Sequence, residues 1–394
     1  MMQQRLQRCQ RGMQLSDKER LGFYASVFTA SLGLGLYLYF VPIFAQSLGA
    51  TFLDLGYIGT AGGLIYAVAP FFVGQLADRT SRRLLYVIAI LINLTATFSL
   101  IFCKSVNDVI MVRTFAGLGL AFFWPTTETL VLDLTRKEER VKEMGRYSIY
   151  WASAFLIGPF IGGLIIQNFG FLTLFVISCA LSFSSLLGVI VLILPKRSLT
   201  ERREAKPKLK EQFGVVKQLL PWYGLLVCYG LIFSIVSSIF PGYANSIGIN
   251  ALLVGVLFTA FGIARVATYA SGHYLHLGER KVLGSASFLL VVACVLIVLF
   301  PTFSVFLVAI ALMGACFAVL FPVSIGLTSR HYSESQLGAA VGFYEGTYGV
   351  GAAIGPILAG TLATILDVRL SFVGAAFAGV LMIIIAARAK TYRN

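Results

Sequence analysis

Charged residues are scarce in this sequence. Only 12% of its 394 residues are charged, whereas 58% are hydrophobic and 32 are phenylalanine. The mean hydropathy is +0.85. A soluble globular chain normally carries about 25% charged residues. This shortage therefore favours a membrane protein that crosses the bilayer several times.

Signatures of catalysis and of cofactor binding are absent as well. The sequence contains no GxxxxGK[ST] loop that could cradle the phosphates of ATP, and no hydrolase or protease motif. Its three histidines, His273, His276 and His331, fall in predicted loops without metal-ligand spacing. The six cysteines are scattered without a CxxC pair. We therefore expect no enzyme activity, no cofactor and no metal ion, and an energy source other than ATP.

Long apolar runs occupy most of the chain. A transmembrane helix needs about 20 apolar residues to cross a hydrocarbon core of roughly 30 Å. Twelve such segments are predicted, at about residues 21–46, 53–76, 84–103, 108–134, 145–168, 171–194, 219–243, 250–274, 282–300, 304–329, 337–363 and 370–388. The pattern predicts an all-α integral membrane protein with 12 transmembrane helices.

The basic residues are distributed unevenly between the two sides of the predicted membrane. Of the 31 lysines and arginines, Lys104 and Arg369 fall in loops on one side, and Arg113 and Arg265 fall inside apolar segments. The others lie at the chain ends or in loops on the opposite side. The positive-inside rule then places both termini in the cytoplasm of a cell-membrane protein. The net charge of +14 suits an anionic membrane surface rather than a nucleic acid.

A basic polar stretch divides the chain nearly in half. The predicted organisation is a cytoplasmic N-terminal segment (1–20), an N-terminal six-helix bundle (21–194), a basic cytoplasmic linker (195–218), a C-terminal six-helix bundle (219–388) and a cytoplasmic tail (389–394). Neither end is large enough for a soluble domain. The polar residues thus separate two apolar units of similar length.

The two halves also resemble each other in sequence. A shift of 197 residues places Pro125 over Pro322, and it places the run Gly145–Gly163 over Gly342–Gly360 with several identities. Two like halves that both start inside imply a parallel repeat about an axis along the membrane normal. This predicts two pseudo-symmetric six-helix bundles, with a substrate site between them near the midplane and alternating access by rocking.

The loop between the second and third segments reads "GQLADRTSRR". It resembles the loop signature of the major facilitator superfamily (MFS) at Gly74, Leu76, Ala77, Asp78, Arg79 and Arg82. The resemblance implies that Asp78 and Arg82 latch the two halves on the cytoplasmic side. The expected partner is the start of the eleventh segment, around 336–338, and Asp133 is another candidate. The alternative is a solvated loop that follows the positive-inside rule.

The fourth segment carries charge within the membrane. Arg113, Gly117, Trp124 and Glu128 fall on one stripe of a helix. The run "RTFAGLG" resembles the helix-four motif of the same family, which implies a role for Arg113 in proton coupling. Alternatively, Arg113 reaches the outer interface by snorkelling, and Glu128 is a solvated carboxylate at the inner end.

The fifth segment contains the run "IGPFIGG". It resembles the helix-five motif of MFS exporters at Gly158, Pro159, Gly162 and Gly163. The alternative is ordinary packing by small residues, because the eleventh segment has a similar run.

Glu345 is the most distinctive single residue. It shares a helical stripe with Gly349, Ala352 and Pro356, so we expect it to face packed helices and not lipid. A carboxyl group in that position is a candidate proton carrier. Arg265 lies at a similar predicted depth, and the two could form an ion pair that either opens during transport or closes the structure permanently.

Aromatic residues on the predicted cavity helices suit an amphipathic or aromatic substrate. Tyr37, Trp124 and Tyr348 are the candidates for the cavity wall. The leading interpretation is a proton-coupled exporter of small amphipathic compounds, similar to the 12-helix drug/proton antiporters. It would act as a monomer by rocker-switch alternating access. The alternatives are a symporter or uniporter for a sugar or organic anion, a lipid flippase, and a membrane sensor that does not transport.

Overall fold

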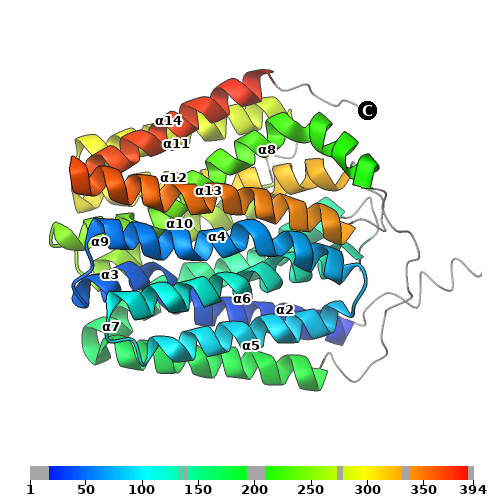
Figure 1. Ribbon diagram of the computed structural model, residues 1–394, viewed down its shortest axis with the longest axis horizontal. Helices are drawn as coiled ribbons and strands as arrows, with labels where there is room; N and C mark the ends of the chain where they lie inside the picture. Colours follow the sequence, from blue (N-terminus) through cyan, green and yellow to red (C-terminus); the bar gives the residue numbers. More distant parts are fainter. Residues whose placement is uncertain are drawn as a thin grey trace, which may run out of the picture.

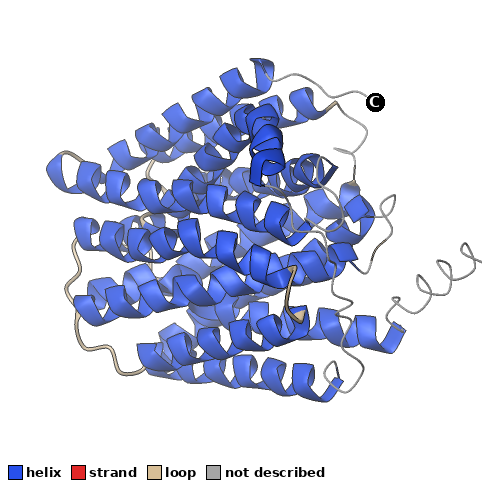
Figure 2. Cartoon of the chain, turned by 45° about the vertical axis from the view of Figure 1, so that its right-hand side comes forward, coloured by secondary structure: helices blue, strands red, loops and turns tan. Residues whose placement is uncertain are grey.

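The computed structural model describes residues 17–133, 135, 140–192, 209–272, 278–330 and 337–388, and these residues form helices and short connections without a strand (Figure 2). The helices lie side by side along one direction (Figure 1). The N-terminal half contains α2 (Asp17–Tyr37), η1 (Leu38–Phe40), α3 (Val41–Ser47), α4 (Phe52–Ala77), α5 (Arg82–Leu100), α6 (Val106–Asp133) and α7 (Arg140–Leu192). The C-terminal half contains α8 (Leu209–Ser238), α9 (Phe240–Ser246), α10 (Ala251–Ser271), α11 (Glu279–Leu299), α12 (Phe303–Arg330), α13 (Leu337–Ile365) and α14 (Val368–Arg388).

Within these described residues, 11 helical segments are long and apolar enough to cross a membrane. One of them, α7, has 53 residues and joins two helices at Gly170, where φ is 80° and ψ is 177°. Glycine reaches this conformation without the steric penalty that other residues meet there. Counting α7 as two crossings gives the predicted 12-helix arrangement.

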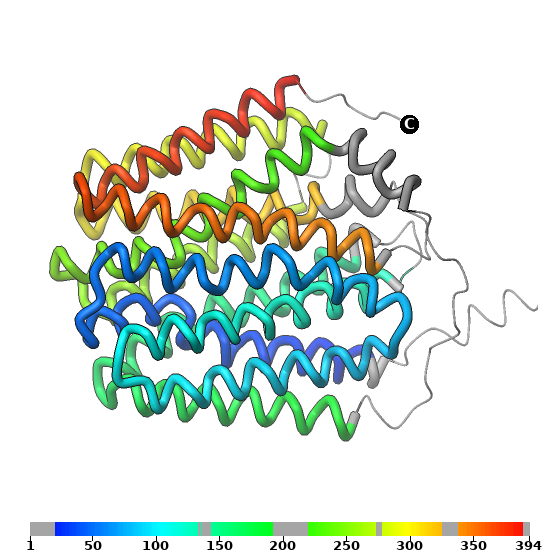
Figure 3. The backbone as a smooth tube through the Cα atoms, in the orientation of Figure 1, coloured from blue at the N-terminus to red at the C-terminus, as the bar shows by residue number. Residues whose placement is uncertain are grey.

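The internal repeat is visible in the bounds of the helices. A shift of 197 residues carries α6 (Val106–Asp133) onto α12 (Phe303–Arg330), and it carries the start of α5 onto the start of α11. The N-terminal half fills the lower part of Figure 3 and the C-terminal half the upper part. Each half is therefore a separate bundle, as the repeat predicts.

The first helix of each half is broken near its end. Between α2 and α3 the chain forms the short 3-10 turn η1, and α3 has Pro42 in its first turn. Likewise, α9 follows α8 with Pro241 in its first turn. Proline lacks an N–H and clashes with the preceding turn, so a straight helix cannot continue through it. Continuous hydrophobicity hides both breaks in the sequence.

The predicted boundary at residue 219 differs from the structure. Helix α8 begins at Leu209, so the last part of the predicted linker is helical, and residues 193–208 lie outside the described part. The prediction followed the apolar run, whereas the helix continues into a polar stretch with leucine, lysine and glutamate, which are good helix formers.

The two halves meet along two helix pairs. Helix α4 packs against α13, and the first part of α7 packs against α10. Figure 1 shows α4 and α13 side by side where the halves join. The start of α2 and the end of α14 lie at the same end of the bundle in that view. The contact between the halves surrounds the candidate site.

Candidate functional site

A cavity lies between the two halves, with a volume of about 180 Å³. One ordered water needs only about 10–15 Å³ on such a measure, so the space holds more than a few waters. The N-terminal half contributes α2, η1, α4, α6 and α7 to its wall, and the C-terminal half contributes α8, α10, α12 and α13. Four predicted ionisable residues line it, namely Arg113, Glu128, Arg265 and Glu345.

Glu345 reaches the cavity from α13. Its side chain is 5% exposed, and the hydroxyl group of Tyr66 on α4 donates a hydrogen bond to Oε2. The two helices approach closely there, because a Cβ atom on Gly349 would overlap the carbonyl oxygen of Tyr66. The predicted stripe thus faces a helix of the other half and not lipid.

Glu128 on α6 is the nearest acidic neighbour of Glu345. It is 1% exposed, and apart from Glu345 no described residue offers a hydrogen bond to either of its carboxyl oxygens. The two carboxyl groups lie within interaction distance of each other. Two carboxylates repel strongly in a medium of low dielectric constant, and a single proton held between them removes that repulsion. We call Glu128 and Glu345 the carboxyl pair.

Arg265 on α10 has aromatic neighbours instead of an acidic one. Its Cζ lies 4.4 Å from the ring centre of Phe261, 5.3 Å from that of Trp151 and 5.8 Å from that of Phe233. The structure does not contain the Arg265–Glu345 ion pair that the sequence suggested. The aromatic rings occupy the surroundings of the guanidinium group, and Glu345 is bonded to Tyr66 instead.

Arg113 also points into the protein. It lines the cavity from α6, and its Nη1 atom is buried without a hydrogen-bond acceptor in the described part of the chain. A snorkelling arginine would hold its head group in water at the interface. The structure therefore does not support the snorkelling alternative for Arg113.

The aromatic wall differs in one place from the prediction. Trp124 and Tyr348 line the cavity, whereas Tyr37 lies at a smaller neighbouring pocket, where its hydroxyl group accepts a hydrogen bond of 3.2 Å from Thr97. Tyr39 takes the place of Tyr37 in the cavity wall, because the turn η1 changes the direction of the side chains from a straight helix.

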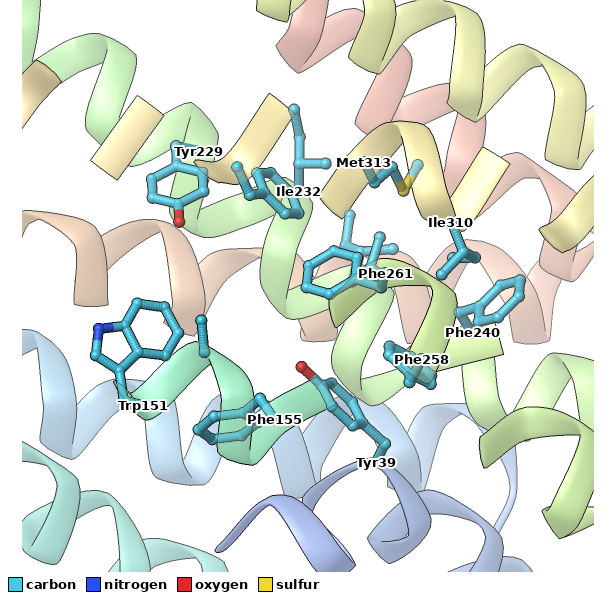
Figure 4. Packing of buried hydrophobic residues seen from close by; sticks show 14 of the residues in the cluster. Tyr39, Trp151, Phe155, Tyr229, Ile232, Phe240, Phe258, Phe261, Ile310 and Met313 are labelled. Carbon is cyan, nitrogen blue, oxygen red and sulfur yellow. The ribbon is translucent and has the colours of Figure 1, made fainter. Parts of the chain in front are cut away.

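Figure 4 shows the aromatic side of the site. The hydroxyl groups of Tyr39 and Tyr229 point toward the region between Trp151 and Phe261. The rings come from η1, α8, α7 and α10, so both halves contribute. The wall is therefore apolar and aromatic, with a few hydroxyl groups directed inward, as in sites for compounds with an aromatic body.

The predicted latch residues lie at the end of α4. Asp78 Oδ1 accepts a hydrogen bond of 3.0 Å from the backbone amide of Gly338, and Oδ2 accepts one of 3.0 Å from Ala339. These amides are at the start of α13, where a helix has unpaired N–H groups and a partial positive charge. Arg82 binds Asp78 Oδ1 at 3.2 Å and donates to the carbonyl oxygen of Thr129 on α6. We call these contacts the latch.

The electrostatics of Asp78 agree with a contact that excludes water. Burial raises the pKa of its carboxyl group above the ordinary value, although Arg82 and the two backbone amides lower it in part. Arg79 is exposed and does not belong to the latch. The side chain of Asp133 lies outside the described part of the structure, so that alternative is not tested.

Gly74 allows the latch to close. A Cβ atom at this position would overlap the carbonyl oxygen of Gly338, and one on Gly338 would crowd Asp78 and the backbone of Gly74. Helices that cross this closely need small residues at the contact. The glycine of the loop signature thus has a steric reason.

The helix-five motif packs on two neighbours at once. Gly158 and Gly162 lie against α2, where a Cβ on Gly162 would overlap the carbonyl oxygen of Leu36. Gly163 and Pro159 lie against α10 of the other half, where a Cβ on Gly255 would overlap the carbonyl oxygen of Pro159. The motif therefore sits at the junction of the halves. This geometry is what packing requires, and a role in export stays a prediction.

A second polar contact joins the halves at the opposite end from the latch. Gln46 Nε2 donates a hydrogen bond of 3.2 Å to the carbonyl oxygen of Gly242, and Asn245 Nδ2 donates one of 3.0 Å to Gln46 Oε1. We call this pair of bonds the clasp. The cavity lies between the latch and the clasp.

Sequence reasoning missed several site residues. Tyr66 is the main omission, and its signal was a run of small residues on the same stripe of the second segment, at Gly59, Gly63, Pro70 and Gly74. That stripe predicts a close helix contact, and Tyr66 is the polar group within it.

We expect Asp78→Ala to open the latch. The substitution removes the acceptor for two backbone amides and for Arg82, and truncating one member of a buried charged pair costs about 2–5 kcal/mol at an interface. A cysteine placed at Ser238, which lines the cavity, should then react at least about tenfold faster with a water-soluble maleimide. The rise should occur in membrane vesicles of one orientation only, on a background without other cysteines.

The matched control is Asp54→Ala. Asp54 caps the other end of α4 by accepting hydrogen bonds from Thr51, so it shares the helix but not the latch. Unchanged labelling of the Asp78 variant, or an equal rise in the Asp54 variant, would contradict the latch.

The chain is similar to known proteins over most of its length. A sequence profile described as Major Facilitator Superfamily matches residues 23–226 and again residues 222–393. The quinolone resistance protein NorA of Staphylococcus aureus is 22% identical over 381 residues, which cover 94% of this chain and 96% of that protein. An uncharacterised MFS-type transporter of Methanocaldococcus jannaschii is 23% identical over 365 residues, covering 89% and 93%.

Solved structures share the fold. The crystal structure of the human organic anion transporter MFSD10 superposes with a TM-score of 0.71 at 16% identity. That of the nucleoside transporter NupG superposes with a TM-score of 0.73 at 14% identity. Each comparison covers 94% of this chain and 100% of the other.

Proposed function

Because this chain belongs to the major facilitator superfamily, we propose that it is a proton-coupled exporter of small amphipathic compounds. Membership of this family supports a multi-pass membrane transporter rather than an enzyme, and the coupling ion, direction and substrate class are our proposal. It would work as a monomer in the cell membrane, with both termini in the cytoplasm, as the distribution of basic residues predicts.

The carboxyl pair is the observation that carries the proposal. Ionisable groups inside a membrane are costly to bury and default to functional roles. Glu128 and Glu345 come from different halves, and they line the same cavity. The other titratable or charged groups of that cavity are Tyr39, Tyr66, Arg113, Tyr229, Arg265, Tyr344 and Tyr348. Arginine keeps its proton, and tyrosine ordinarily releases its own only at about pH 10, so the two carboxyl groups are the groups of this lining that can be ionised at neutral pH and can take up a proton.

Competition at the carboxyl pair couples the two flows. A cationic or hydrogen-bond-donating group of the substrate stabilises the fully ionised pair, whereas a bound proton removes one of its two negative charges. The two ligands therefore exclude each other, and release of one permits binding of the other. A proton entering from outside then drives the compound outward.

Alternating access would use the latch and the clasp in turn. Opening the latch exposes the cavity to one side, and opening the clasp exposes it to the other. Because Asp78 and Gln46 each bind the opposite half, rocking one bundle against the other would break one contact while keeping the other.

The name of one relative supports the substrate class. NorA is described as a quinolone resistance protein, and quinolone drugs are small organic compounds. The cavity wall supports an aromatic compound more than a sugar, because the described residues that line it include Tyr39, Trp124, Trp151 and Phe233 but no asparagine or glutamine. The sensor alternative finds no support in either observation.

Proteoliposomes with an acidic interior test the proposal. Tetraphenylphosphonium, a neutral aromatic drug or lactose is added outside while the internal pH is recorded. We expect the first two to raise the internal pH through the purified protein, in a saturable way, and lactose to have no effect. Transport of any of these compounds without a proton signal would refute proton exchange.

A further inference from the structure

We propose that Arg265 binds an acidic group of the transported compound, and that the surrounding rings hold the aromatic body that carries this group. The inference deepens the proposed function, because it rests on the same cavity and names a chemical class of substrate. It follows from a deeply buried cation for which the described residues provide no hydrogen-bond acceptor or ion-pair partner.

Arg265 is buried but unpaired. The residue is 4% exposed, and its Nε atom is buried without a hydrogen-bond acceptor among the described residues. No carboxylate of the described residues lies within 4 Å of it, and Glu345 on the wall of the same cavity is hydrogen-bonded to Tyr66. A buried cation normally has an anion or several acceptors as partners. The missing partner is therefore expected from the ligand.

The aromatic rings stabilise the charge without using its hydrogen bonds. Phe261, Trp151 and Phe233 lie within 4.4–5.8 Å of Cζ, in the range of cation–π attraction. The five N–H donors of a guanidinium group lie in its plane, and a π-face accepts little from them. Their fork matches a carboxylate, sulfonate or phosphonate, which can bind with two parallel bonds.

The position of Arg265 places this group against an aromatic wall. Trp151 lies against Arg265, and its ring centre is 5.4 Å from the ring centre of Trp124. Both tryptophans line the cavity. A flat ring next to an acidic group can therefore stack on indole while the acid binds the guanidinium group. Arg113 lines the same cavity, but within the described part of the chain no aromatic ring lies over its guanidinium group, which favours Arg265 as the specific site.

The two acidic residues give the cavity a negatively charged region in addition to the positive charge at Arg265. With the carboxyl pair ionised, Glu128 and Glu345 balance Arg113 and Arg265. A compound with a basic group and an acidic group is complementary to both charges, because the basic group binds the carboxyl pair and the acidic group binds Arg265. We therefore infer that the preferred cargo is an aromatic compound that carries an acid as well as a base.

Equilibrium binding tests the acid site without a proton gradient. The probes are 2-naphthoate and its neutral amide, 2-naphthamide, which have nearly the same size. Binding is measured by quenching of tryptophan fluorescence in a Trp222→Phe background, because Trp222 does not line the cavity. We expect the wild-type protein to bind naphthoate at least about tenfold more tightly than the amide.

Substitutions show which residue causes the preference for naphthoate over the amide. In Arg265→Gln the preference for naphthoate should disappear while the amide binds as before, which also shows that the variant is folded. Arg265→Lys should keep part of it. Arg369→Gln is the matched control, since Arg369 lies in the first turn of α14, is half-exposed, pairs with Asp367 at 3.0 Å and does not line the cavity. Arg113→Gln should retain the preference.

The outcomes separate this inference from the proposed function. Failure of wild-type protein to bind naphthoate, or a preference that survives in Arg265→Gln, overturns the acid site. If the preference for naphthoate is lost in Arg113→Gln and kept in Arg265→Gln, the acidic group binds at Arg113, and the assignment to Arg265 is wrong. An intact acid preference together with no proton movement in proteoliposomes would refute proton exchange alone.

Discussion

Glu345→Gln should abolish proton exchange by this protein. Glutamine keeps the shape of the side chain and can still accept the hydrogen bond from Tyr66, but it cannot carry a proton. Removing a group that transfers the proton lowers rates by roughly 100-fold or more. We expect the substrate-dependent pH signal in proteoliposomes to fall to the background of protein-free vesicles, while binding of a neutral aromatic compound persists.

Two further variants make that result specific. Glu128→Gln removes the other half of the carboxyl pair and should also suppress the exchange, because the shared proton loses one of its two sites. Asp367→Asn is the control, since Asp367 is a carboxylate of an exposed loop that pairs with Arg369. Normal exchange by Glu345→Gln would show that this carboxyl group is structural.

Gly74→Leu should prevent the halves from closing at the latch. The new Cβ atom would meet the carbonyl oxygen of Gly338 and the Cα of Gly342. Because both are backbone atoms, no side-chain rotation relieves the overlap, and the helices must separate. We expect transport to be lost and the distance between spin labels at Leu84 and Arg388 to increase by several ångströms.

Gly188→Leu is the matched control for this experiment. Nothing lies within 4 Å of a Cβ atom built on Gly188, so the same substitution adds the same bulk without touching the other half. An unchanged spin-label distance in Gly74→Leu, or the same loss of transport in Gly188→Leu, would contradict a steric role at the latch.

The helices and their order could be predicted from the sequence because each crossing needs its own apolar run. The repeat and the basic loops then identified two halves. The breaks at Pro42 and Pro241 were missed, because hydrophobicity continues through them and only the local backbone changes. The same cause explains the error at Tyr37, whose direction depends on the turn η1 and not on a straight helix.

The contact of Asp78 with the start of α13 could be predicted because a family signature and a helix start are both local features. Asp78 lies on the amides of Gly338 and Ala339, where the sequence predicted a partner, although its role in gating stays a prediction. The partner of Glu345 was harder to identify. Which side chain faces it depends on how α4, α6 and α13 pack, and no single segment contains that information.

The predicted ion pair between Arg265 and Glu345 was wrong because it was inferred from charge and depth alone. Opposite charges at similar depth suggested an ion pair with Glu345, but depth along the membrane leaves the rotation of each helix open. In the structure Arg265 faces three aromatic rings and Glu345 faces Tyr66. The packing of the helices thus leaves Arg265 without an acidic partner among the described residues, and this arrangement is the basis of the proposed acid site.

The central claim is that the carboxyl pair holds one proton, which the substrate displaces. Proton release on binding tests it directly, with purified protein in weakly buffered solution and a pH indicator, using the compound that gives the largest exchange in proteoliposomes. The account predicts release of about one proton per bound molecule at neutral pH, and none in Glu345→Gln. Saturable binding without proton release by the wild-type protein would contradict it.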